Sequence, residues 1–341
     1  MSAFPLTKVP TLASYVSILR TIGAPVDAGL RRARLPTLFE EIPDAWIPYE
    51  RVRYFTADMA EREVIPNLGL IPQASSLQHA LTQSFLAPVL STPSLFQALQ
   101  RIPSLTSRIT TDIRFWLEPA GDQIRACLVL PAPLEVPGYD IGETRTLGLI
   151  KKIIRVYAGP DFKPTRVLLA SRARDLRFDL EHAYNGVPVK TDQPYGAIEF
   201  PRALLASICT STVESPTSSN APTPDVELPA TFAERLEASL IPYLLDGYPH
   251  IDLGAEIAGC SVRTLQRKLS KEQKTYSDII EKIRCRAAMS LLYDVELKIA
   301  QIAILLGYSD QSAFTRAFRS WTSITPGEYR ASEPGTGSIS S

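Results

Sequence analysis

Two short stretches near the C-terminus carry basic, amide and hydroxyl side chains of the kinds that contact DNA. The first holds Arg263, Thr264, Gln266, Arg267 and Lys268, and the second holds Gln311, Ser312, Thr315, Arg316 and Arg319. Arginine bonds guanine, and glutamine bonds adenine, through two hydrogen bonds each. Each such pair contributes about 1–3 kcal/mol of discrimination against the wrong base. Held on one face of a helix, either set would form a surface that reads double-stranded DNA.

The residues that precede each stretch follow one pattern, and this pattern predicts the element that holds it. An alanine comes first, then a glycine, then a serine: Ala255, Gly259 and Ser261 in the first copy, and Ala303, Gly307 and Ser309 in the second. A helix-turn-helix needs a small residue where its helices touch, a glycine for the positive φ of the turn, and a serine to cap the next helix. The sequence therefore predicts two such units, with recognition helices at about 262–270 and 310–319.

Apolar residues recur at helical spacing in and between the two units. The inward positions are predicted to be Val262, Leu265 and Leu269 in the first unit and Phe314, Ala317 and Phe318 in the second. A connecting helix is expected over residues 276–292, roughly 25 Å long at 1.5 Å per residue. Segments of the major groove on one side of a duplex recur every ~34 Å. A helix of this length could therefore hold both recognition helices in adjacent segments of the groove.

The chain as a whole is neutral, but its basic residues are concentrated in one segment of the second domain. Its 36 basic residues balance 36 acidic ones, and residues 229–333 hold 13 of each. Residues 262–274, in contrast, hold five basic residues and one acid. Because phosphate affinity depends on where cations meet the groove, we expect modest non-specific DNA binding and a larger share from base contacts.

Composition also predicts domain organisation and cellular setting. The stretch from 211 to 229 is rich in Pro, Ser and Thr and is expected to be a linker. It would separate a domain at 1–210 from one at 230–332, with a disordered tail at 333–341. No apolar run is long enough to span a membrane, residues 1–8 lack the pattern of a signal peptide, and the four cysteines lack metal-site spacing. These features predict a cytoplasmic protein.

The first domain shows a mixed pattern. Helices are predicted at Leu12–Ile22, Val26–Arg34, Ala45–Glu63, Ser76–Leu90, Ser94–Ser107, Thr144–Tyr157 and Asp179–Asn185. Strands are predicted at Thr111–Glu118, Ile124–Leu130, Arg166–Ser171 and Ala197–Phe200. The first two strands flank a turn and read as a hairpin. The predicted fold class is an α+β N-terminal domain followed by an all-α C-terminal domain with two helix-turn-helix units joined by a linker helix.

No pattern in the chain predicts an enzyme, a metal site or a cofactor. The three histidines, His79, His182 and His250, form no metal-binding pair, and no nucleophile elbow or phosphate loop is present. Arg172, Arg174 and Arg177 could attract an anionic effector, although a solvated loop is the favoured interpretation. Lys151 and Lys152 lie on an amphipathic segment, Leu147–Tyr157, whose apolar side fits either a core or a dimer contact.

Residues 230–331 closely resemble the AraC/XylS DNA-binding domain. The resemblance rests on the phrases at 261–269, 299–303, 306–312, 314–318 and, most specifically, 321–330. It implies seven helices, of which the third and sixth enter the major groove. Three positions depart from the family pattern. No glycine follows the first recognition helix near Gln273 and Lys274, Ala313 replaces an aromatic residue or histidine, and Ser323 replaces a glycine.

The first domain is similar, more weakly, to the arabinose-binding-type domain of one branch of AraC-type regulators, through residues 91–99, the hairpin, and residues 182–189 with 197–200. This implies a sensor that binds a small effector or pairs with a second copy as a homodimer; the sugar is a family label. The resemblances imply a ligand-responsive transcription activator that binds DNA and recruits RNA polymerase. The alternatives are an architectural protein without sequence preference and, with no catalytic constellation to support it, a DNA-modifying enzyme.

Overall fold

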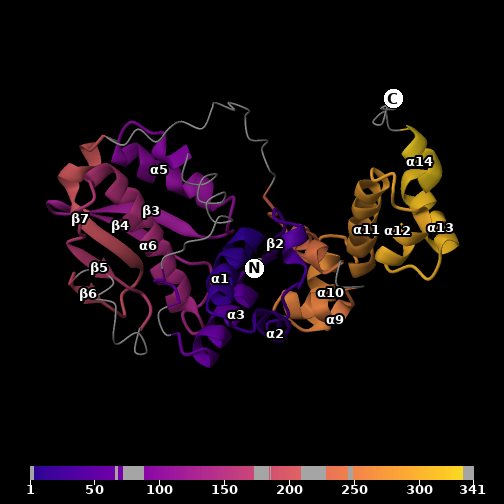
Figure 1. Ribbon diagram of the computed structural model, residues 1–341, viewed down its shortest axis with the longest axis horizontal. Coiled ribbons are helices and arrows are strands. Elements are labelled where there is room, and N and C mark those ends of the chain that lie inside the picture. Colours follow the sequence, from indigo (N-terminus) through magenta and orange to yellow (C-terminus); the bar gives the residue numbers. More distant parts are fainter. Residues whose placement is uncertain are drawn as a thin grey trace. The chain divides into compact units, whose positions relative to one another are not determined.

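The structure is a computed structural model that describes two compact units. The described residues are 4–65, 68–71, 88–172, 184, 186–208, 228–244 and 249–332 (Figure 1). One unit spans Pro5–Leu228, and the other spans Pro229–Ser341 together with Met1–Phe4. The expected fold class, a mixed domain followed by a helical one, is confirmed. The predicted helix at Asp179–Asn185, most of Ser76–Leu90, nearly all of the linker and the tail lie outside the described residues.

Three helices form the first layer of the N-terminal unit. They are α1 (Val9–Thr21), α2 (Val26–Arg32) and α3 (Tyr49–Arg62). Their apolar faces share a core that includes Leu12, Leu30, Phe55 and Met59, all fully buried. A Cβ at Gly29 would lie 2.4 Å from the Met59 sulfur, so glycine permits the close approach of α2 and α3.

The predicted helix at Ala45–Glu63 is wrong at its start. Residues Trp46–Pro48 form strand β2, which pairs antiparallel with β1 (Leu6–Lys8), and α3 begins only at Tyr49. The hydrogen bonds that hold β2 come from a segment far away in the sequence. Local helical periodicity does not report such a partner, and tertiary pairing overrides it here.

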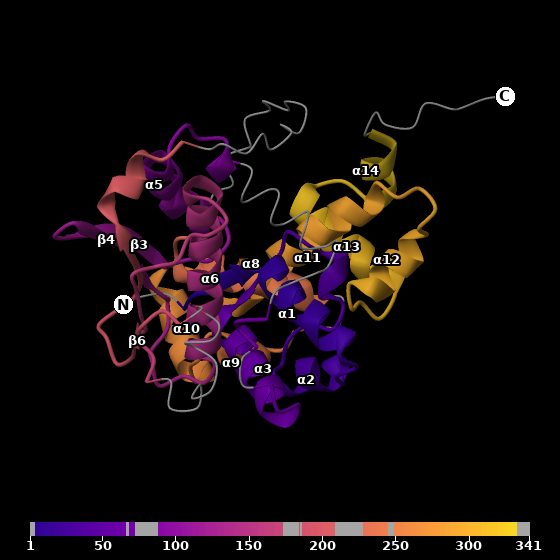
Figure 2. The same ribbon diagram turned by 60° about the vertical axis from the view of Figure 1, so that its left-hand side comes forward.

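The second layer is a five-stranded sheet with two helices on one face. Its strands are β3 (Arg114–Ala120), β4 (Gln123–Val129), β5 (Arg166–Leu168), β6 (Val189–Lys190) and β7 (Gly196–Pro201), in the order β3-β4-β7-β5-β6. All pairs are antiparallel except β5–β6. The expected hairpin is confirmed, with Gly121 at φ +70° in its turn. Helices α5 (Leu95–Thr106) and α6 (Tyr139–Ala158) lie against the sheet (Figure 2). Their apolar side chains share one core with the residues on one face of the sheet.

A buried carboxylate joins α6 to the end of β5. Glu143 is 1% exposed, and its oxygens accept hydrogen bonds from Ala170 N at 2.7 Å, Ser171 N at 3.1 Å and Ser171 Oγ at 2.6 Å. A Cβ at Gly196 would lie 2.6 Å from its Oε1. The carboxylate therefore satisfies the backbone where β5 stops and no strand continues.

Seven α-helices make up the described part of the C-terminal unit, as expected. They are α8 (Phe232–Leu240), α9 (Ile251–Ile257), α10 (Val262–Lys271), α11 (Tyr276–Leu292), α12 (Ile299–Leu305), α13 (Gln311–Thr322) and α14 (Pro326–Ser332). Helix α11 has the bounds predicted for the connecting helix. It contributes Ile279, Ile280 and Ile283 to a core with α8–α10, and Ala288 and Leu292 to a second core with α12–α14. The two helix-turn-helix units therefore have separate cores on one shared helix.

Two positions that lack the family's glycine adopt the backbone conformation that glycine favours. Gln273, just after α10, has φ +55°, and Ser323, at the C-terminal cap of α13, has φ +67°. A left-handed conformation costs a residue with a Cβ about 1–2 kcal/mol. Both residues thus keep the backbone conformation that a glycine would adopt there, at an energetic cost.

Replacing Gln273 or Ser323 with glycine is therefore expected to stabilise the C-terminal unit by about 0.5–1 kcal/mol each, because the strain is removed at some cost in unfolded-chain entropy. Thermal unfolding of the full chain measures the change. Ser320→Gly is the matched control, because it makes the same substitution within helical backbone three residues earlier. It should destabilise by a similar amount, and a gain there as large as at Ser323 would contradict the argument.

Candidate nucleic-acid interface

The first helix-turn-helix consists of α9 and α10. Ala255 is buried at the contact of the two helices, and Gly259 has φ +59° in the turn. Ser261 caps α10, since its Oγ accepts a hydrogen bond from Thr264 N at 3.3 Å. Leu265 and Leu269 are fully buried beneath the helix. The small residue, the glycine and the cap all have the roles that the sequence predicts.

The five predicted contact residues of α10 differ in how far they are exposed to solvent. Arg263, Gln266 and Arg267 are exposed and share one face at i, i+3 and i+4. Thr264 and Lys268 are half-buried. The Lys268 ammonium lies 4.7 Å from the centre of the Phe232 ring, where it packs on α8. The exposed face therefore carries two arginines and one glutamine.

The second unit consists of α12 and α13. Ala303 is buried and Gly307 has φ +76°, as expected. The predicted cap, Ser309, is wrong by one residue. Asp310 caps α13, accepting from Ala313 N at 2.7 Å, while Ser309 Oγ donates to Asp310. These hydrogen bonds lower the pKa of Asp310, and a carboxylate also interacts favourably with the positive end of the helix dipole.

An aromatic cluster supports the exposed face of α13. Phe314 and Phe318 are fully buried, and Phe318 packs near the rings of Trp321 and Tyr329. The predicted contact residues Gln311, Ser312, Arg316 and Arg319 are exposed, whereas Thr315 is half-buried and donates to the Gln311 carbonyl at 2.8 Å. The face of α13 therefore carries both of its arginines toward solvent.

Polar contacts join α11 to the second helix-turn-helix and to α8. The Arg284 guanidinium lies 4.7 Å from the centre of the Tyr308 ring and donates to the carbonyl of Gly307, in the turn of the second unit, at 3.4 Å. On α8, the Glu237 carboxylate accepts from Lys282 and Arg286 of α11. Helix α11 thus holds the turn of the second unit and also α8, the helix that precedes the first unit.

A contact that the sequence did not predict locks the end of α10. The Glu272 carboxylate accepts from Phe232 N at 3.0 Å and from Ala233 N at 2.9 Å, in the first turn of α8. Free N–H groups at a helix N-terminus attract such a carboxylate. The only sequence signal was an acid within a basic stretch, which does not identify its partner.

Comparison with known proteins covers both the N-terminal and the C-terminal unit. A family profile described as a helix-turn-helix domain matches residues 255–332. A second, described as the arabinose-binding domain of AraC transcription regulator, N-terminal, matches residues 23–208, more than half of the chain. The chain belongs to the AraC family of transcription regulators. Its C-terminal unit is therefore a DNA-binding domain.

Individual relatives agree with the AraC family. The HTH-type transcriptional regulator VirS of Mycobacterium tuberculosis is 28% identical over 357 residues, covering 96% of each chain. The ornithine utilization regulator of Pseudomonas aeruginosa is 39% identical over 83 residues, 24% of each chain. The crystal structure of the transcriptional regulator CdpR from Pseudomonas aeruginosa is 24% identical and covers 90% of this chain and 97% of its own, with a TM-score of 0.37. That score is too low to establish a common arrangement of whole chains.

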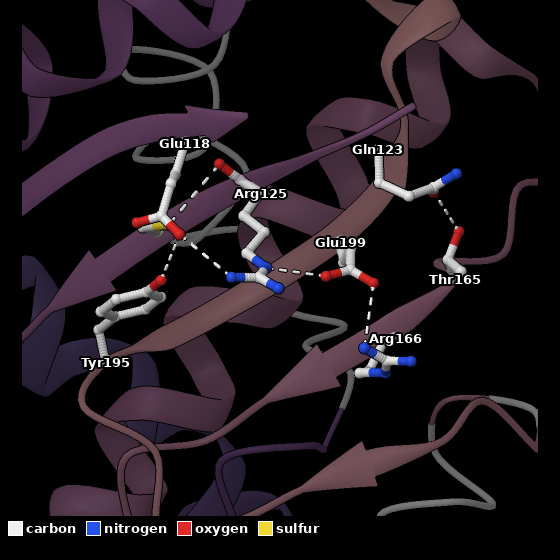
Figure 3. Close-up of polar contacts among 8 residues, drawn as sticks. Glu118, Gln123, Arg125, Thr165, Arg166, Tyr195 and Glu199 are labelled. Carbon is white, nitrogen blue, oxygen red and sulfur yellow. Dashed lines mark hydrogen bonds and ion pairs between the residues drawn. The ribbon is translucent and has the colours of Figure 1, made fainter. Parts of the chain in front are cut away.

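The AraC-type N-terminal unit has a polar network on the sheet face opposite α5 and α6 (Figure 3). Arg125 donates to Glu199 at 2.8 Å and to Glu118 at 3.1 Å, and the Tyr195 hydroxyl donates to Glu118 at 2.6 Å. Arg166 lies 3.5 Å from the other oxygen of Glu199. The hydrogen bonds from Tyr195 and Arg125 lower the pKa of Glu118. Each charge has a partner within the network, which therefore reads as structural.

The candidate residues of the N-terminal unit have mixed outcomes. The apolar side of Leu147–Tyr157 is core, because Leu147, Ile150 and Ile154 are buried against the sheet. Lys152 is exposed, and the Lys151 ammonium lies 4.9 Å from the centre of the Tyr184 ring. Arg172 lies 3.5 Å from Asp192. His79, His182, Arg174 and Arg177 lie outside the described residues.

Among the described ranges, no three His, Cys, Asp or Glu side chains gather as a metal site would require. Within the same ranges, no helix has both the length and the apolar character of a membrane span.

Proposed function

We propose that this AraC-family regulator recognises a specific operator by inserting α10 and α13 into adjacent segments of the major groove. The observation that supports this most is the pairing of two exposed faces, Arg263–Gln266–Arg267 on α10 and Gln311–Ser312–Arg316–Arg319 on α13, within one unit built around α11. Arginine and glutamine on such faces favour base reading over phosphate contact alone. Thr264, Lys268 and Thr315 then serve at the edge of the interface.

The N-terminal unit is proposed to act as the effector-responsive part. Binding of a small molecule there, or pairing with a second copy, changes how two DNA-binding units occupy neighbouring half-sites, and RNA polymerase is then recruited. Activation of transcription is the proposed outcome. The chain acts through binding, and no catalytic step is part of the proposal.

Arg267→Ala and Arg316→Ala test the two reading faces. Each is expected to weaken binding to the operator about 10- to 100-fold, because a bidentate contact is worth about 1–3 kcal/mol. The operator is obtained by selecting bound fragments from a random DNA pool with the wild-type protein. Fluorescence anisotropy then gives the affinity of each variant at a fixed salt concentration, because affinity falls steeply with salt.

Arg155→Ala is the matched control, since Arg155 is exposed on α6 in the other unit and its removal changes net charge equally. It should leave operator affinity unchanged. Unchanged operator affinity in both recognition-helix variants would overturn the assignment of the faces. If both variants lost affinity equally for operator and random DNA, the architectural alternative, binding without sequence preference, would be favoured.

A further inference from the structure

Arg145 is a half-buried cation on α6 that has no acidic partner among the described residues. Its guanidinium carbon lies 4.3 Å from the centre of the Tyr15 ring on α1. In the described part of the chain, no carboxylate oxygen comes within 4.0 Å of its nitrogens. Burial lowers the pKa of Arg145 below the ordinary arginine value. Removing a cation from water is costly unless an anion compensates for the lost hydration.

Other arginines of the same unit show what Arg145 lacks. Arg125 is half-buried and has two carboxylate partners, and Arg32, at the edge of the α2–α3 contact, is held by Asp58 at 2.5 Å. Arg53 is fully buried, and its guanidinium donates to the carbonyls of Pro133 and Val136. Arg155 is unpaired among the described residues but is exposed to water. Arg145 is half-buried and, in the part of the chain that the structure describes, has no carboxylate acceptor.

Two buried tyrosines, Tyr15 in contact with Arg145 and Tyr49 close to Tyr15, add donors that make no hydrogen bond among the described residues. Tyr15 is 3% exposed and Tyr49, at the start of α3, is 6% exposed. Within the described residues neither hydroxyl makes a hydrogen bond. Burial raises the pKa of both phenols, so they stay protonated and able to donate. The Tyr49 hydroxyl lies 3.1 Å from where a Cβ at Gly142 would be, one turn before Arg145 on α6.

The surrounding acids do not supply the missing acceptor. Glu143 is committed to Ala170 and Ser171. Asp140, earlier on α6, acts on Tyr15 through its charge and raises the phenol pKa, but it forms no ion pair with Arg145. Arg145 and Tyr15 therefore bring a cationic and a neutral donor together, and Tyr49 adds a second phenol close to Tyr15 and to Gly142 of α6. Among the described residues, no carboxylate pairs with Arg145.

From this geometry we propose that Arg145, Tyr15 and Tyr49 bind the carboxylate of a small organic acid, which is the effector of this regulator. This deepens the proposed function and rests on its effector-responsive part. A planar carboxylate matches the fork of a guanidinium and has further lone pairs for two phenols. A single arginine balances the one negative charge of a monocarboxylate, whereas a phosphate dianion would keep excess charge in a half-buried site.

The test is calorimetric titration of the full-length protein, without DNA, with acetate, butyrate and benzoate. Benzamide is the neutral counterpart of benzoate, and inorganic phosphate is the competing anion. At least one carboxylate is expected to bind, and benzamide should not. Arg145→Gln should weaken that carboxylate about 10- to 100-fold, the range expected for lost charge-assisted hydrogen bonds. Tyr15→Phe and Tyr49→Phe should each weaken it several-fold.

Arg155→Gln is the control, because it removes an exposed arginine from the same helix and should leave the affinity intact. The unliganded melting temperature of each variant checks folding, and Arg145→Lys keeps the charge if the glutamine variant does not fold. The proposal is overturned if no carboxylate binds, if benzamide binds equally, if phosphate alone binds through Arg145, or if the Arg145 variants bind as wild type does.

A second experiment distinguishes a failure of the proposed carboxylate site from a failure of the proposed function. Operator affinity of the wild-type protein is measured with and without the carboxylate that binds. If the acid binds through Arg145 without changing operator affinity or half-site occupancy, the site stands and its effector role fails. If a neutral molecule changes operator affinity and no carboxylate binds, the regulator stands and the proposed site fails.

Discussion

Replacing Phe318 with alanine is expected to destabilise the second helix-turn-helix by about 3–5 kcal/mol, because truncating a fully buried aromatic residue removes burial and leaves a cavity. Phe318 is 0% exposed and lies 5.5–6.3 Å, centre to centre, from the rings of Phe314, Trp321 and Tyr329. The core it belongs to is small and is bounded by α11. The first unit has a core of its own, so it should stay folded.

Hydrogen exchange of the full chain measures this prediction helix by helix. Amides of α12–α14 should lose protection, whereas those of α8–α10 should keep it. Leu265→Ala truncates the fully buried side chain under α10 and is the reciprocal control. It should remove protection from the amides of α8–α10 and leave those of α12–α14 protected. Equal loss of protection across both units in either variant would show that α11 makes the two cores one cooperative body.

Glu143→Ala is expected to cost the N-terminal unit about 3–5 kcal/mol. The carboxylate is the acceptor for two backbone N–H groups and one hydroxyl, and each buried donor left unsatisfied costs about 1–3 kcal/mol. Urea unfolding followed by tryptophan fluorescence measures the loss. Glu61→Ala, which removes an exposed acid from α3, should change stability by no more than about 0.5 kcal/mol. A loss at Glu143 no greater than at Glu61 would show that water replaces the carboxylate.

The same residue predicts a pH dependence. Burial raises the pKa of Glu143 above its ordinary value of 4.5, against the opposing effect of its three donors. The pKa of Glu143 is higher in the folded chain than in the unfolded chain. Its contribution to the free energy of unfolding is therefore fully present below pH 4.5 and is lost as the pH rises through the pKa of the folded state. In Glu143→Gln this component should vanish, so the stability difference between wild type and variant should shrink as pH rises above 4.5.

The DNA-binding unit could be predicted closely from the sequence because its signals are local. Gly259 and Gly307 lie in turns that need positive φ, and the bounds of α11 follow from the spacing of apolar residues. The one misplaced cap has a local cause too. Ser309 and Asp310 are both good capping residues, and the choice between them depends on where the turn ends, which composition does not fix.

The N-terminal unit was less predictable because its key contacts join distant segments. Strand β2 exists through pairing with Leu6–Lys8. Tyr15, Tyr49 and Arg145 come from three helices, and nothing in their sequence neighbourhoods marks them. What distinguishes Arg145 is the acceptor it lacks, and such an absence becomes visible only when the neighbours of the side chain are known.

The Glu272 carboxylate has a mechanical consequence. It fastens the end of α10 to the first turn of α8, and Arg235 in that same helix donates to the carbonyl of Pro229 at 3.0 Å. The backbone that enters the unit is thus stapled, within a few residues, to the helix proposed to sit in the groove. Tension applied to the chain at Leu228 would reach α10 directly, without first deforming α11. A change of tension at Leu228 would therefore act on α10 before it acts on α13.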